Sequence, residues 1–81
     1  MPSLLASSLR RGEAAVVDSV LGGDALAARL DACGLWPGAP IELLAAAPFG
    51  DPLLFSVHGY RLALRRSEAE RVCVRVAEPQ A

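Results

Sequence analysis

Apolar and polar residues alternate in four short runs along the second half of the chain. The runs cover residues 40–46, 53–58, 60–65 and 71–77, and turn residues separate them. A two-residue period places every second side chain on one face of a strand, so each run predicts a half-buried β-strand. Tyr60 is expected to face inward. The residues expected in the core are inward-facing strand residues and one helical leucine, namely Leu30, Leu43, Val57, Leu62, Leu64, Val72 and Val74.

An earlier strand is predicted over residues 13–21, a segment rich in valine and alanine that lies between glycines. Its alternation is imperfect, because Val16 and Val17 are adjacent. A β-bulge, or burial of the strand on both faces, would explain this irregularity.

One helix is predicted over Ala25–Ala32. Asp24 precedes it and can accept hydrogen bonds from the free amides of the first turn. Gly34 can adopt the left-handed conformation that ends a helix. A helix of this length is marginal on its own, so it must pack against the sheet. One further helical turn is expected at residues 67–70, where Ser-Glu-Ala-Glu matches a capping box.

Five short strands with a helix between the first two predict a small barrel. The expected fold class is mainly β: a five-stranded SH3-like barrel with one short helix between strands one and two. The alternation alone equally permits an OB-like barrel. The chain has 81 residues, enough for one small domain. We expect that domain at residues 9–77, after a flexible arm at 1–8 and before a tail at 78–81.

Charge and hydropathy exclude two classes of partner. The formal net charge is −1 and the arginines cluster only as the pairs Arg10-Arg11 and Arg65-Arg66. Nucleic-acid binding requires a basic surface, so it is not expected. No apolar run approaches the ~20 residues of a membrane-spanning helix, and the first residues lack the basic region of a signal peptide. We therefore expect no membrane insertion and a cytoplasmic location.

No catalytic or metal-binding arrangement is evident in the sequence. Nucleophilic catalysis needs a serine or cysteine beside a base, and the chain has a single histidine, His58. Zinc sites use three or four ligands that are commonly paired in sequence, whereas Cys33, His58 and Cys73 are isolated. In a reducing cytosol the two cysteines are expected to be unpaired, small apolar side chains. We expect no enzyme activity, no cofactor and no metal site; a Cys/His metal site is the alternative.

Four residues are candidate partner contacts: Trp36, Pro48, Phe49 and Leu54. Phe49 is predicted at a turn tip, where polar residues are usual, and Trp36 follows the end of the helix. Exposed aromatic residues are favoured anchors in protein interfaces. The alternative is that both rings fold back over a thin core. The mean hydropathy of +0.36 permits either an apolar partner surface or a simple bias toward alanine and leucine.

Several short motifs occur in a characteristic order along nearly the whole chain. They are Gly34-Leu35, Pro37-Gly38, Ala47-Pro48, Gly50-Asp51-Pro52, Val57, Gly59, Leu62-Ala63-Leu64-Arg65 and Glu68-Ala69. In this order and spacing the chain resembles the ferrous iron transport protein A (FeoA) family. It departs from the family at Ala45-Ala46-Ala47, where many members carry a basic residue, and at Cys33, where a larger apolar residue is usual.

The resemblance implies an SH3-like barrel that binds the cytoplasmic side of the ferrous iron permease, through the GTP-binding domain of that permease. The protein would then lie at the inner membrane only through its partner. The same fold resembles the SH3-like domain of iron-dependent repressors, so a metal-responsive module is the alternative function. No helix-turn-helix is present in the sequence, which favours the transport role. Self-association and the direction of regulation are left open.

Overall fold

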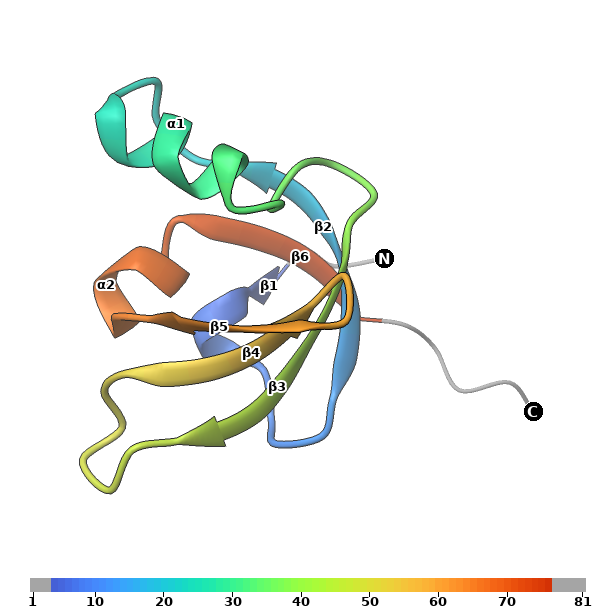
Figure 1. Ribbon diagram of the computed structural model, residues 1–81, viewed down its shortest axis with the longest axis vertical. Coiled ribbons are helices and arrows are strands. Elements are labelled where there is room, and N and C mark those ends of the chain that lie inside the picture. Colours follow the sequence, from blue (N-terminus) through green and yellow to red (C-terminus); the bar gives the residue numbers. More distant parts are fainter. Residues whose placement is uncertain (1–3, 77–81) are drawn as a thin grey trace.

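The computed structural model describes residues 4–76, which form one antiparallel sheet curled into an open barrel (Figure 1). The strand order is β1-β6-β2-β3-β4-β5, so β1 and β5 are the two edges. No helix among the described residues is long and apolar enough to cross a membrane. In chain order the elements are β1 (Leu4–Leu5), the 3-10 turn η1 (Ala6–Ser8), β2 (Ala14–Val20), α1 (Ala25–Ala32), β3 (Pro40–Ala46), β4 (Leu53–Val57), β5 (Tyr60–Leu64), α2 (Arg66–Ala69) and β6 (Val72–Val76).

The mainly β class is confirmed, but the sheet has six strands rather than five. The additional strand lies within the segment expected to be a flexible arm. Leu4 pairs with Val74 and Leu5 pairs with Cys73, and the next residue, Ala6, is fully buried. This pairing satisfies backbone groups that β6 would otherwise leave open. Two leucines are too short a run to show a two-residue period, so the sequence could not predict this strand. Residues 1–3 and 77–81, which include the tail predicted at 78–81, lie outside the described part of the chain.

The core prediction is largely confirmed. Six of the seven expected residues are buried, but Leu62 is only partly buried, and Tyr60 keeps 42% of its surface exposed. Both lie on β5, which has a neighbour on one side only, so burial along this strand is incomplete. The largest fully buried side chain is Phe55, at the centre of β4, which the expected core set did not include.

The irregularity predicted in the first long strand is present as a register shift in the pairing of β2 with β6, between Val17 and Ser19. A second shift lies in β3, where Leu43 and Ala45 pair with adjacent residues of β4. Such bulges increase the local twist of a strand, which helps a sheet to curl.

Helix α1 lies across one end of the barrel, and its first turn is tied to the sheet (Figure 1). The Asp24 Oδ1 atom accepts a hydrogen bond from the Ala27 amide at 3.1 Å, which confirms the predicted cap. The same oxygen accepts a 2.7 Å bond from Arg71 Nη2, and Arg71 Nε donates to the Leu21 carbonyl at 2.9 Å. The Arg71 guanidinium, and then the Ala27 amide, hold the pKa of Asp24 below its usual value.

A candidate interaction groove between α1 and the free edge of β5

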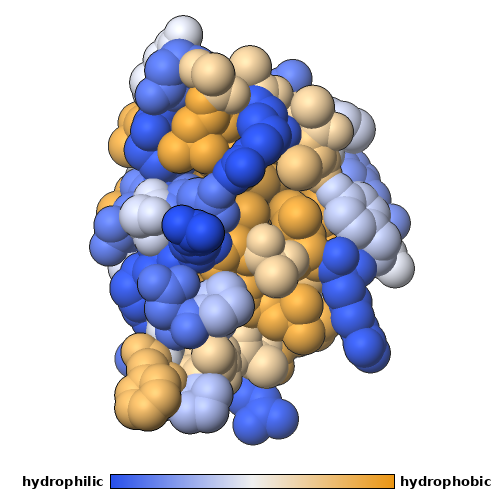
Figure 2. All heavy atoms as spheres, turned by 60° about the vertical axis from the view of Figure 1, so that its left-hand side comes forward, coloured by the Kyte–Doolittle hydropathy of each residue, from blue (hydrophilic) through white to orange (hydrophobic). Residues whose placement is uncertain are grey.

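A groove with both apolar and charged lining residues separates α1 from β5, with a volume of about 350 Å³. Figure 2 shows the corresponding face as an apolar band with hydrophilic side chains on both sides. The groove exists because β5 is the last strand of the sheet and has no neighbour beyond it. Its lining comes from the helix, from β5 and from the segments flanking it: Arg29, Leu30, Cys33, Pro52, Leu62, Ala63, Leu64, Arg65 and Glu68.

One rim of the groove carries an ion pair that sequence reasoning missed. Arg29 of α1 pairs with Glu68 of α2. Glu68 Oε1 also accepts a 2.9 Å hydrogen bond from the Arg65 amide, so this one carboxylate caps α2 and forms the ion pair with Arg29 of α1. Because the Arg29 side chain is 61% exposed, the pair contributes little stability, and its role is to define the rim. A pairing across 39 positions leaves no local pattern in the sequence.

Phe49 lies at the tip of the β3–β4 hairpin and is 98% exposed. Its loop is nevertheless braced. Arg66, at the start of α2, donates from its amide to Asp51 Oδ1 and from Nε to the Gly50 carbonyl, each at 3.0 Å. Arg66 Nη1 also reaches the Ser7 carbonyl at 3.4 Å. These bonds fix the loop that carries Phe49, although the ring itself packs against nothing within residues 4–76.

Trp36 has intermediate exposure and a specific neighbour. Its ring centroid lies 4.8 Å from that of His58, and 47% of the residue is exposed. His58 Nε2 lies 3.0 Å from the Gly34 carbonyl oxygen and donates a hydrogen bond to it. His58 and Gly59 both have positive φ, at 51° and 84°, as a two-residue type I′ turn requires. The ring of Trp36 thus packs on the β4–β5 turn.

The four predicted contact residues do not form one surface. Phe49 and Pro48 precede β4, whereas Trp36 packs on the residue that follows β4. A strand of five residues separates the two sites by roughly 16 Å. Leu54 is half-buried and pairs with Ala63, so it lies beside the groove. The sequence predicts that each of these residues lies near a turn. It does not predict which turns lie at the same end of the sheet.

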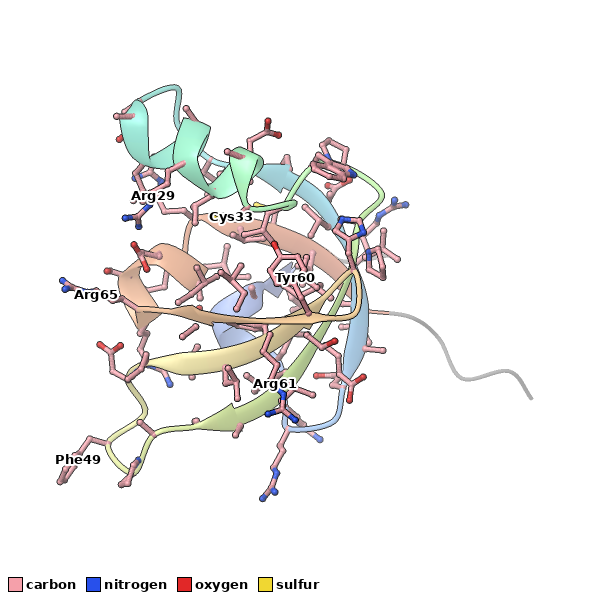
Figure 3. All side chains as sticks on the ribbon, in the orientation of Figure 1. Arg29, Cys33, Phe49, Tyr60, Arg61 and Arg65 are labelled. Atoms are coloured by element: carbon pink, nitrogen blue, oxygen red, sulfur yellow. The ribbon has the colours of Figure 1, made fainter. Side chains whose placement is uncertain are left out.

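The Phe49 loop and the groove adjoin each other, because Pro52 belongs to the loop and also lines the groove. In Figure 3, Phe49, Arg65 and Arg29 all lie on the same side of the molecule. A partner on this side could contact the groove and the exposed ring together.

A larger hollow of about 490 Å³ lies along another side of α1, between the helix and the end of β2. Its lining includes Val20, Ala27, Ala28 and Leu35. It is more open to solvent than the β5 groove, and neither edge strand of the described sheet lines it. We therefore regard the β5 groove as the better candidate site, although it is smaller.

Metal ligands do not gather within residues 4–76. No group of three or more histidine, cysteine or acidic side chains lies close enough to hold an ion there. Cys33 and Cys73 are both free and half-buried. Cys33 lines the groove, but His58 is absent from its lining. The expectation that the protein has no metal site stays a prediction.

Solved structures with similar folds include FeoA proteins and metal-dependent repressors. A FeoA of Stenotrophomonas maltophilia, an SH3 domain protein solved as a complex with zinc, is 41% identical; the match covers 88% of each chain, with a TM-score of 0.78. A FeoA of Chlorobium tepidum is 36% identical over 96% of this chain and 74% of that one, with a TM-score of 0.87. A manganese-dependent transcriptional repressor, at 16% identity and a TM-score of 0.83 over 94% of this chain and 42% of its own, is similar in fold alone.

A search of curated proteins found no match. The family model of the FeoA domain, however, matches residues 5–76, which is nearly the whole chain. The matched region begins at β1 and ends with β6, so it coincides with the barrel. With the solved FeoA structures, this match confirms both the SH3-like fold and the resemblance found in the sequence: the chain belongs to the FeoA family, which is linked to ferrous iron transport.

Proposed function

We propose that this protein is an interaction module that assists or regulates a ferrous iron transporter, by binding the cytoplasmic GTP-binding domain of the iron permease. Family membership supports the link to iron transport. The observation that carries the proposal is a single face on which a groove with apolar and charged lining adjoins an almost fully exposed aromatic ring on a braced loop. On this proposal the protein is cytoplasmic and reaches the membrane through its partner.

Rigidity of the Phe49 loop favours binding. Association costs the freedom of every group that becomes ordered at the interface. Since Arg66 already holds Gly50 and Asp51, little further order is needed when the ring enters a pocket. Aromatic residues presented in this way are typical anchors of protein interfaces. Pro48, Leu54 and the groove would surround this anchor, whereas Trp36 lies at the other end of β4 and would be peripheral.

Binding accounts for the groove better than catalysis does. The groove contains one thiol, Cys33, and the acidic Glu68, whose carboxylate already pairs with Arg29 and caps α2. Neither arrangement provides a nucleophile with a base oriented beside it. No observation within the described residues favours the metal-responsive alternative over the transport role.

The proposal is tested by titrating the purified GTP-binding domain into the full chain by calorimetry, with Phe49→Ala and Leu21→Ala as a matched pair. Leu21 is also an exposed large apolar residue, but it precedes α1 and lies outside the groove lining. We expect Phe49→Ala to weaken binding by about 1–3 kcal/mol, as for a moderate anchor, and Leu21→Ala to leave it unchanged. Absence of binding by the unaltered chain, or equal loss in both variants, would refute the proposal.

A further inference from the structure

Strand β5 offers unused backbone groups along the groove. The two-residue His58-Gly59 turn makes Val57 and Tyr60 a hydrogen-bonded pair. In an antiparallel ladder such pairs alternate with pairs whose amides and carbonyls point outward. The outward-pointing residues of β5 are therefore Arg61 and Ala63.

These groups remain open in the described part of the chain. β5 pairs only with β4, and no turn, cap or side-chain hydrogen bond within residues 4–76 uses the backbone of Arg61 or Ala63. At the opposite edge, β1 presents only two residues. An open edge of five residues is a template for another extended chain.

Side chains along β5 alternate between an apolar and a basic face. Leu62 and Leu64 point toward the core side, whereas Arg61 and Ala63 point to the other side. Ala63 and Arg65 line the groove together with the two leucines, because the groove runs along the edge of the strand. Arg65 continues the basic alternation at the end of the strand. Neither Arg61 nor Arg65 takes part in an ion pair within the described residues, where the pairs use Arg29, Arg71 and Arg75.

We infer that β5 binds an extended segment of the partner as a seventh strand, whose acidic residues lie opposite Arg61 and Arg65 and whose apolar residues lie opposite Leu62 and Leu64. This inference rests on the proposed function and specifies how the groove recognises its partner. The expected ligand pattern is acidic–apolar–any–apolar–acidic. Because the pattern reads the same in both directions, it holds for parallel and antiparallel addition.

Two other occupants fit the edge less well. A helix bonds its own amides and carbonyls internally, so it would leave the groups of Arg61 and Ala63 unpaired. A second copy that paired through β5 would bring Arg61 of one edge toward Arg65 of the other. Like charges placed opposite each other destabilise a strand pair. An acidic, apolar strand satisfies both the backbone and the arginines.

The test uses two blocked peptides of equal composition and the full chain labelled with nitrogen-15. The first peptide has the core Glu-Val-Thr-Val-Glu, and the second has the core Val-Glu-Thr-Glu-Val, which exchanges the two faces. We expect the first to bind at least about tenfold more tightly. At saturation it should slow amide hydrogen exchange of Arg61 and Ala63 by about tenfold or more. Equal affinity of the two peptides, or unchanged exchange at both amides, would overturn strand addition.

A backbone variant tests the same point independently. Ala63→Pro removes the outward amide of an edge strand, a position where proline is tolerated, whereas Ala63→Ser retains it. We expect about a tenfold loss of peptide affinity for the proline variant and little change for serine. Unchanged affinity in a folded Ala63→Pro variant would contradict the inference. If that variant unfolds, methylating single backbone nitrogens of the peptide removes hydrogen bonds that the peptide would donate to β5. If every singly N-methylated peptide bound as tightly as the unmodified one, strand addition would be contradicted.

The same exchange measurement separates this inference from the proposed function. If the GTP-binding domain binds but the Arg61 and Ala63 amides stay unprotected, strand addition is wrong and the transport role stands. If the domain does not bind, the proposed function is wrong, and the peptide affinities still decide whether β5 accepts a strand.

Discussion

The two turns that flank β4 carry aromatic residues in opposite situations. At one end, Phe49 is 98% exposed and packs against no other residue of the described chain, and Arg66 holds its loop through hydrogen bonds. At the other end, Trp36 packs on His58, which donates to the Gly34 carbonyl. The comparison teaches that exposure alone does not identify a contact residue: Trp36 packs on the β4–β5 turn, whereas the Phe49 ring contacts no other part of residues 4–76.

The largest effect should come from the core that both turns share. Leu64 is 3% exposed and pairs with Leu53 at the Phe49 end of the sheet. Leu64→Ala should cost about 2–5 kcal/mol of the free energy of unfolding, because it removes buried methyl groups and leaves a cavity. Urea denaturation followed by circular dichroism measures this cost. A loss below about 1 kcal/mol would show that β5 is loosely packed at this end also.

A smaller loss of stability is expected at the Trp36 end. Gly34 has φ +99°, and a Cβ atom there would lie 3.0 Å from His58 Cδ2 and 3.2 Å from the Tyr60 hydroxyl. Gly34→Ala should destabilise the fold by about 1–2 kcal/mol through backbone strain, and more if His58 cannot move aside. Gly38→Ala is the matched control, since Gly38 has φ +93° but no atom within 4 Å of the added Cβ.

The difference between these two glycine variants in urea denaturation isolates the packing around His58 from the cost of positive φ. Equal losses would mean that His58 and Tyr60 move aside at no measurable cost, so this end of the sheet would be less tightly packed than the contacts indicate.

Much of the fold could be predicted from local patterns. The helix boundaries, the Asp24 cap, the strand at 40–46 and most of the strand expected at 53–58 follow from residues that are close in sequence, although β4 ends at Val57 and His58 belongs to the turn. The site could not be predicted in the same way. Its groove depends on β5 being the last strand, which is a property of barrel closure. The Arg29–Glu68 pair and the Arg66 brace join segments far apart in sequence, and β1 is too short to show a period.

Phe49→Ala should change the free energy of unfolding by less than about 0.5 kcal/mol, because the ring contacts no other part of the described chain. Trp36→Ala, by contrast, should lose the aromatic packing, about 0.5–1.5 kcal/mol. Urea denaturation of the two variants in parallel measures the difference between their free energies of unfolding. If Phe49→Ala were the more destabilising of the two, Phe49 would be a structural residue and the partner surface would have to be sought elsewhere.

Metal ions should have the smallest effect. His58 is the residue most suited to bind one, but its Nε2 atom already bonds the Gly34 carbonyl, and no cluster of three ligand side chains occurs within residues 4–76. Tight zinc or iron sites need several ligands held together. Calorimetric titration with zinc and, without oxygen, with ferrous iron should therefore show no one-to-one binding tighter than about 1 µM. A nanomolar isotherm that His58→Ala abolishes would reverse this conclusion. The Trp36 turn would then be a sensing site, and the metal-responsive alternative would become the better account of the protein.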